Sequence, residues 1–105
     1  MKDITLTSHV VMDIRIHAVT MEEAVAFAEK QIMEGKPSMI ATANAEMIMI
    51  AQKDRELSRI LNEADLVVPD GAGVLWAGEK LGTPFPERVT GADLTTELLK
   101  KASVM

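Results

Sequence analysis

The sequence predicts a small α/β domain built around a parallel β-sheet. Short apolar segments typical of strands alternate with segments of helical periodicity. This alternation with short links favours parallel strands joined by right-handed crossovers. At 105 residues the chain has room for a single domain, residues 1–105, and its 48% hydrophobic content is enough for a core.

The first predicted strand lies within residues 10–17, and its alternation begins at Met12. Apolar Met12, Ile14 and Ile16 alternate there with polar residues. This period of two is typical of a half-buried strand near a sheet edge, and it places His17 on the solvated face.

A helix is expected next. Thr20 and Glu23 have the spacing of a capping box, which marks a helix start. Apolar residues then recur at helical spacing, and Gly35 followed by Pro37 predicts the helix end.

The second predicted strand, residues 38–42, is short and mostly apolar, as a buried parallel strand should be. Residues 47–51 then open a helical stripe that continues to residue 64. Asp54 is a suitable N-cap, so a break near Lys53 is expected to divide this segment into two helices.

The third predicted strand, residues 66–68, leads into a Pro-Asp-Gly turn and a helix that ends near Lys80. We expect Trp76 in this helix to belong to the core. Two prolines exclude regular structure over residues 82–86. A last helix is predicted to carry Leu94, Leu98 and Leu99 on one face.

These elements make a small three-layer, Rossmann-like βαβαβα unit with three strands. Another strand would follow the last helix in such a fold, so we expect an incomplete half of a larger domain. An uncovered sheet edge would expose backbone groups and apolar side chains. The sequence therefore predicts a homo-oligomer that buries Leu94, Leu98, Leu99 and Val104 between chains.

Composition limits the classes of function. A net charge of −5 argues against nucleic acid as the main partner. The absence of cysteine excludes disulfides, thiolate zinc sites and a cysteine nucleophile. No apolar run approaches the length of a membrane span. Nothing in the sequence resembles a dedicated metal site, and no cofactor is expected.

Polar residues follow two predicted strands that should be neighbours. Thr42 and Asn44 end the second strand, and Asp70 ends the third. Because parallel strands end at one edge of a sheet, a hydroxyl, a carboxamide and a carboxylate are expected to reach one ligand there. The carboxylate is suited to act as a general base. Alternatively, Thr42 and Asn44 simply cap the next helix.

Further candidate binding residues surround this edge. Gly71 and Gly73 permit close approach of a ligand to the backbone. Arg88 is suited to bind a phosphate or diphosphate, and Asp93 lies five residues beyond it. In the alternative interpretation, Arg88 pairs with Glu87 or Asp93 at the surface.

Three segments resemble motifs of the WecG/TagA/CpsF glycosyltransferase family. They are Thr42–Glu46, Ala64–Gly73 and Pro84–Leu94, and the similarity extends from about Met12 to Lys101. Their order and spacing make the resemblance specific. Members of the family are longer, so the resemblance implies that this chain corresponds to the N-terminal half of a glycosyltransferase.

The resemblance implies an inverting transfer of N-acetylmannosamine, or a related sugar, from a UDP-sugar donor. The implied acceptor is a polyprenyl-diphosphate-linked N-acetylglucosamine in teichoic acid or other cell-envelope polysaccharide synthesis. It implies Asp70 as general base, with Thr42 and Asn44 in the same pocket. It also implies a cytoplasmic enzyme that, at full length, is peripheral to the inner face of the cell membrane.

Two other functions remain open at this point. A non-catalytic nucleotide- or phosphate-binding module would use the turn of Gly71 and Gly73 at a helix N-terminus. Against it, Asp70 would repel phosphate and a complete G-x-G-x-x-G pattern is absent. The other possibility is a purely structural oligomerisation module.

Overall fold

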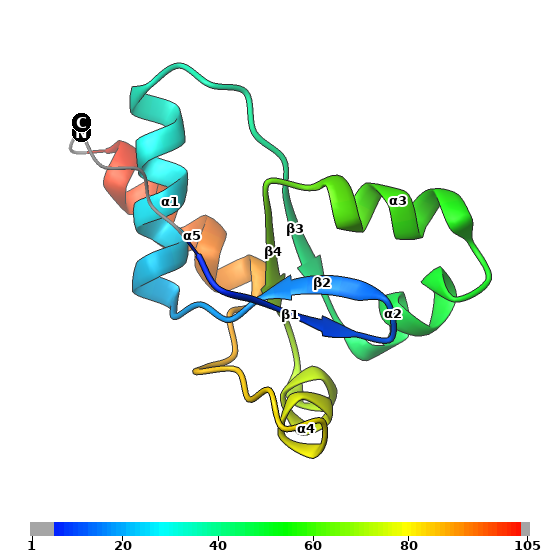
Figure 1. Ribbon diagram of the computed structural model, residues 1–105. Helices are drawn as coiled ribbons and strands as arrows, with labels where there is room; N and C mark the ends of the chain where they lie inside the picture. The colour runs from blue at the N-terminus through cyan, green and yellow to red at the C-terminus, as the bar shows by residue number, and fades with distance from the viewer. Residues whose placement is uncertain (1–5, 104–105) are drawn as a thin grey trace.

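The computed structural model of the protein describes residues 6–103. Helices α1 and α5 lie on one side of the parallel strands β3 and β4, and the β1–β2 hairpin with α2–α4 lies on the other (Figure 1). The α/β class and the Rossmann-like unit are therefore confirmed.

The elements are β1 (Ser8–Val11), β2 (Ile14–His17), α1 (Met21–Met33), β3 (Ile40–Ala43), α2 (Ala45–Ala51), α3 (Arg55–Glu63), β4 (Leu66–Pro69), α4 (Ala72–Lys80) and α5 (Gly91–Ala102).

The buried strand β4 separates two hydrophobic clusters. All of its residues are buried, and its side chains alternate between the two faces. Val67 packs with apolar residues of the hairpin and of α2, α3 and α4. Leu66 and Val68 pack with residues of α1, α5 and the segments before them. An uninterrupted apolar strand is expected where both faces are covered.

The first predicted strand is wrong in its bounds and in its pairing. Met12 and Asp13 have φ values of 48° and 68°, so they form the turn of an antiparallel hairpin between β1 and β2. Two consecutive residues with positive φ are characteristic of two-residue hairpin turns. Among the described residues the parallel sheet therefore has two strands, β3 and β4, and not three.

His17 is buried, which corrects its predicted place on a solvated face. Only 5% of the residue is exposed, and its Nδ1 accepts a hydrogen bond of 3.0 Å from the Val67 amide. That amide lies at the edge of β4 away from β3, where it needs an acceptor. The polar face of β2 therefore covers this edge of β4.

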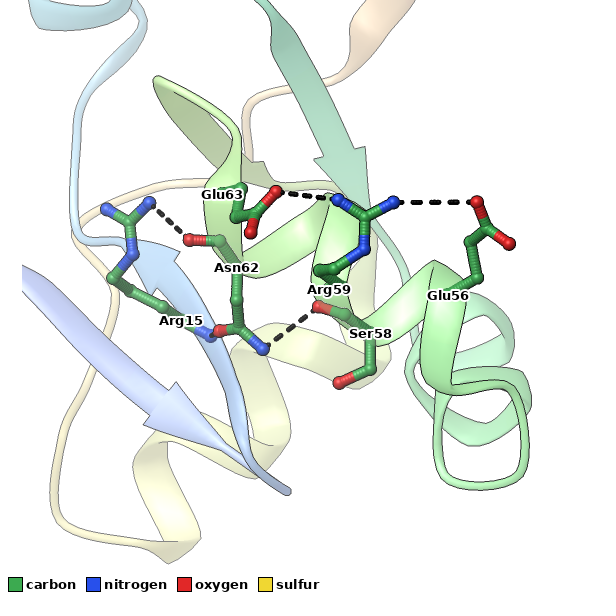
Figure 2. Close-up of polar contacts among 6 residues, drawn as sticks. All are labelled: Arg15, Glu56, Ser58, Arg59, Asn62 and Glu63. Carbon is green, nitrogen blue, oxygen red and sulfur yellow. Dashed lines mark hydrogen bonds and ion pairs between the residues drawn. The ribbon is translucent and has the colours of Figure 1, made fainter.

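Arg15 joins the hairpin to the end of α3. Its guanidinium donates to the carbonyl oxygens of Asn62 and Ala64, at 3.0 and 2.7 Å. These are carbonyls of the kind that a helix leaves without partners at its C-terminus. Figure 2 shows the bond from Arg15 to the Asn62 carbonyl, beside the exposed ion pairs of Arg59. Exposed ion pairs of this kind contribute little to stability.

The predicted helix boundaries are confirmed at two caps. The Thr20 hydroxyl accepts from the Glu23 amide while the Glu23 carboxylate accepts from the Thr20 amide, so the capping box is complete. Asp54 caps α3 by accepting from the Leu57 amide at 3.1 Å. The predicted break therefore separates α2 from α3. No regular element lies between α4 and α5, as the prolines predicted.

Two predictions about apolar residues are wrong. Leu94 is buried and Leu98 packs on the same cluster, but Leu99 is 66% exposed. At 3.6 residues per turn, position 99 lies well around the helix from position 94. Trp76 is 62% exposed rather than part of the core, and Phe85 is the aromatic residue that packs there. Val104 lies outside the described residues.

The buried His17 makes stability depend on pH. Burial, and secondly the positive charge of Arg15, lower the pKa of His17 below its ordinary value of 6.5. The unfolded chain therefore binds a proton near pH 6.5, whereas the folded chain does so only at lower pH. The free energy of unfolding should consequently fall as the pH drops below about 6.5, towards the folded-state pKa.

The His17→Asn variant keeps an acceptor near the Nδ1 position but does not titrate. Urea unfolding of both proteins at pH 7.5 and 5.5 should therefore show a smaller loss of stability in the variant. An equal loss in both proteins would exclude His17 as the cause.

Candidate functional site

The ends of β3 and β4 bring the predicted polar residues to one edge of the sheet. Thr42 is paired in register with Val68, and the Asp70 amide donates a 2.9 Å hydrogen bond to the Ala43 carbonyl. Asn44 follows Ala43 directly. The parallel pairing therefore fixes the backbone of all three candidate residues at the C-terminal edge of the sheet, where open α/β sheets bind their ligands.

The Asp70 carboxylate is only partly engaged by the protein. It is half-buried, and its Oδ2 accepts a long hydrogen bond of 3.4 Å from the Gly91 amide. Its other oxygen has no hydrogen-bond partner among residues 6–103. One carboxylate oxygen is thus available to accept a proton from a ligand.

Asn44 combines a structural contact with a free donor. Its Oδ1 accepts a 2.8 Å hydrogen bond from the Met47 amide, so it caps α2 as one interpretation expected. Its Nδ2 group makes no hydrogen bond to the described part of the chain. The capping bond orients the carboxamide and leaves its amide hydrogens for a ligand.

Thr42 does not cap a helix. Its hydroxyl has no hydrogen-bond partner within residues 6–103. Its methyl group lies against the first residue of α5, because a Cβ built on Gly91 would come within 3.0 Å of Thr42 Cγ2. The lack of a side chain at Gly91 therefore lets α5 begin directly beside Thr42 and Asp70.

The N-terminus of α4 contributes backbone donors to the same edge. Gly71 has a φ of 117°, which side chains other than glycine rarely adopt, and it begins α4 without a side-chain cap. A Cβ at Gly71 would lie 4.0 Å from the Cβ of Asn44. The amides of Ala72 and Gly73 have no acceptor in the described structure, as is usual in a first helical turn. Such amides attract anions.

Arg88 is exposed on a segment whose backbone is fixed. On one side of it, the Glu87 carboxylate accepts a hydrogen bond from the Met21 amide at the start of α1. On the other side, the buried Val89 donates a 2.8 Å hydrogen bond to the Pro69 carbonyl at the end of β4. Within residues 6–103 the Arg88 guanidinium pairs with neither Glu87 nor Asp93, so it remains available to a ligand.

Asp93 is the predicted residue that the structure joins least to this edge. It is exposed in the first turn of α5, and its amide donates to the Thr90 hydroxyl at 3.1 Å. Its carboxylate has no hydrogen bond to any described residue.

The contacts of Gly91 with Asp70 and of Glu87 with α1 were not predicted. For the contact of Gly91 with Asp70, the available signal in the sequence was Thr90 followed by glycine, which marks a helix start.

Other regions of the described structure offer less chemistry. A hollow of about 400 Å³ lies between α1 and α5, but it shares no lining residue with the candidate site. Residues 6–103 contain no group of three or more His, Asp or Glu side chains placed to hold a metal ion. No helix in this range is both long and apolar enough to cross a bilayer.

Comparison with known proteins decides the family. The family model described as "Glycosyl transferase WecG/TagA/CpsF family" matches residues 9–104. This chain belongs to the WecG/TagA/CpsF family. The match includes all three motif segments on which the resemblance was based, and with them Thr42, Asn44, Asp70 and Arg88.

Two curated relatives share the name N-acetylglucosaminyldiphosphoundecaprenol N-acetyl-beta-D-mannosaminyltransferase. The relative from Bacillus spizizenii is 38% identical over 69 residues, which are 66% of this chain and 27% of that protein. The relative from Staphylococcus aureus is 37% identical over 65 residues, or 62% of this chain and 26% of that protein. The matched segment of this family member thus spans about a quarter of each relative.

Proposed function

We propose that this chain supplies the general base and part of the diphosphate site of an inverting glycosyltransferase. The enzyme transfers N-acetylmannosamine, or a related sugar, from a UDP-sugar to a polyprenyl-diphosphate-linked N-acetylglucosamine during cell-envelope polysaccharide or teichoic acid synthesis. The names of the relatives support the sugar and the acceptor. The observation that carries the proposal is that one Asp70 oxygen has no hydrogen-bond partner within residues 6–103, at the sheet edge where Thr42 and Asn44 also lie.

Asp70 is suited to activate the acceptor. Its free oxygen takes the proton of the acceptor hydroxyl while the hydroxyl oxygen attacks the anomeric carbon of the donor. The bond from that carbon to the UDP oxygen breaks, and UDP leaves with the bonding electrons. Because the attack comes from the face opposite UDP, the anomeric configuration inverts. The long bond from Gly91 holds the other oxygen of Asp70 without occupying both.

Arg88 and the start of α4 carry two groups suited to bind diphosphate, because Val89 bonds to Pro69 and α4 begins just after Asp70. The guanidinium of Arg88 forms paired hydrogen bonds with phosphate oxygens well. The free amides at the start of α4 add donors and the positive end of a helix dipole. The carboxamide of Asn44 and the hydroxyl of Thr42 then orient the sugar or the diphosphate between them.

The proposed acceptor is attached to a lipid, so we infer that the reaction takes place at the inner membrane surface. We also propose that, in a protein of the relatives' length, the remaining parts of the donor site lie outside the matched segment. The homo-oligomer remains a prediction from the sequence.

The role of Asp70 is tested in a chimera in which this chain replaces the matching segment of the Bacillus spizizenii relative. Asp70→Asn removes the basic oxygen while keeping an acceptor for the Gly91 amide. Transfer of N-acetylmannosamine from its UDP-sugar to a lipid-linked acceptor should fall about 10²–10⁴-fold, the usual contribution of a general base.

The matched control is Asp54→Asn, which also neutralises a carboxylate but leaves a residue that caps α3 well. This variant should transfer sugar at the rate of the unmodified chimera. Near-normal transfer by the Asp70→Asn chimera would exclude Asp70 as the base. UDP binding without any Asp70-dependent transfer would instead favour the non-catalytic nucleotide-binding module.

Arg88 is tested in this chain alone. Arg88→Ala should weaken UDP binding, measured by calorimetric titration, about tenfold or more, since hydrogen bonds to charged groups contribute about 1.5–3 kcal/mol. Its free energy of unfolding should stay within about 0.5 kcal/mol of wild type, because Arg88 is exposed and has no protein partner within residues 6–103. Arg59→Ala on exposed α3 is the control. Loss of stability with unchanged UDP binding would make Arg88 structural.

A further inference from the structure

An apolar groove lies between the hairpin, α2 and α4. Its volume is about 230 Å³. Every residue that lines it is apolar or glycine. These residues are Val11, Met12, Ala45, Ile48, Met49, Gly73, Val74, Trp76 and Ala77.

The groove is open to solvent along its rim. Met12, Met49 and Trp76 are 49%, 59% and 62% exposed, although each is large and apolar. Exposed apolar side chains gathered on one surface mark binding sites more often than those scattered singly. Flexible methionines at a rim adapt to ligands of irregular shape. The groove is therefore suited to a flexible hydrocarbon.

The groove meets the polar site at the first turns of α2 and α4. Ala45 follows Asn44, and Gly73 lies two residues after Gly71. A Cβ built on Gly73 would come within 3.1 Å of the Ala45 Cβ, so the two helices approach closely at this junction. The same turn of α4 thus offers free amides to the polar site and Gly73 to the groove.

We propose that this groove binds the first isoprene units of the polyprenyl chain of the acceptor, an inference that rests on the function proposed above. The acceptor has a diphosphate at the point where its hydrocarbon begins. With that diphosphate at the α4 amides, and with Arg88 left to the diphosphate of the UDP-sugar, the first isoprene units lie next to Gly73 and enter the groove. Pockets for whole drug-sized ligands measure about 300–1,000 Å³, so this smaller groove holds only the start of the chain.

The only tryptophan of the protein, Trp76, reports directly on this groove. Farnesyl diphosphate, added below the concentration at which it forms micelles, should shift the Trp76 emission to shorter wavelength as hydrocarbon replaces water. Inorganic diphosphate should not cause this shift, but it should compete with farnesyl diphosphate for binding. A shift of equal size with inorganic diphosphate would overturn the proposal.

Met49→Gln makes the groove rim polar, and Ile50→Gln is its matched control. Ile50 is 49% exposed on the same helix but does not line the groove. Met49→Gln should weaken farnesyl diphosphate binding about fivefold or more, while Ile50→Gln leaves it unchanged. Binding of inorganic diphosphate should be the same in both variants.

The outcomes separate the groove from the proposed function. If diphosphate and UDP bind but farnesyl diphosphate leaves Trp76 emission unchanged, the groove proposal is wrong and the proposed function stands. If farnesyl diphosphate shifts the emission but the chimera shows no Asp70-dependent transfer, the groove stands and the proposed function is wrong. A ligand-free emission shift that follows dimer formation in sedimentation, and that Met49→Gln abolishes, would assign the groove to a second copy instead.

Discussion

The parallel pairing of β3 with β4 is the constraint on which the rest of the structure depends. Its last hydrogen bond, from the Asp70 amide to the Ala43 carbonyl, brings together two chain segments that are far apart in the sequence. The other edge of β4 is covered by the His17 side chain at Val67 and by the Val89 amide at Pro69. Each residue of β4 is buried, so a shift in register would disturb both hydrophobic clusters at once.

The candidate site consists of polar side chains that use only part of their hydrogen-bonding capacity within the protein. Asn44 caps α2 with its oxygen and keeps its amide hydrogens, and Asp70 accepts from Gly91 with one oxygen and keeps the other. Contacts of this kind hold polar side chains in place before a ligand arrives, which lowers the entropy cost of binding. The apolar groove begins beside the first turn of α4. A ligand with a polar and an apolar part would therefore bind the polar site and the groove side by side.

Local signals predicted most of the fold and much of the site. Caps such as Thr20 and Asp54, and the turn at Asp70, act within a few residues and are readable in a sequence. The failures concern tertiary contacts. Nothing local indicates that Met12 and Asp13 reverse the chain, or that the edge of β4 needs His17 as an acceptor. The exposure of Trp76 likewise depends on how α4 packs beside the hairpin and α2.

The most direct test of the proposed site is an amide NMR titration of this chain with UDP. Resonances from four segments should shift together with one dissociation constant, because the pairing of β3 with β4 places them at one edge. These segments are residues 42–44, 70–73, 88–89 and 91. Amides in the C-terminal half of α1 should not move. Shifts confined to the hollow between α1 and α5, with residues 70–73 unchanged, would contradict the proposed site.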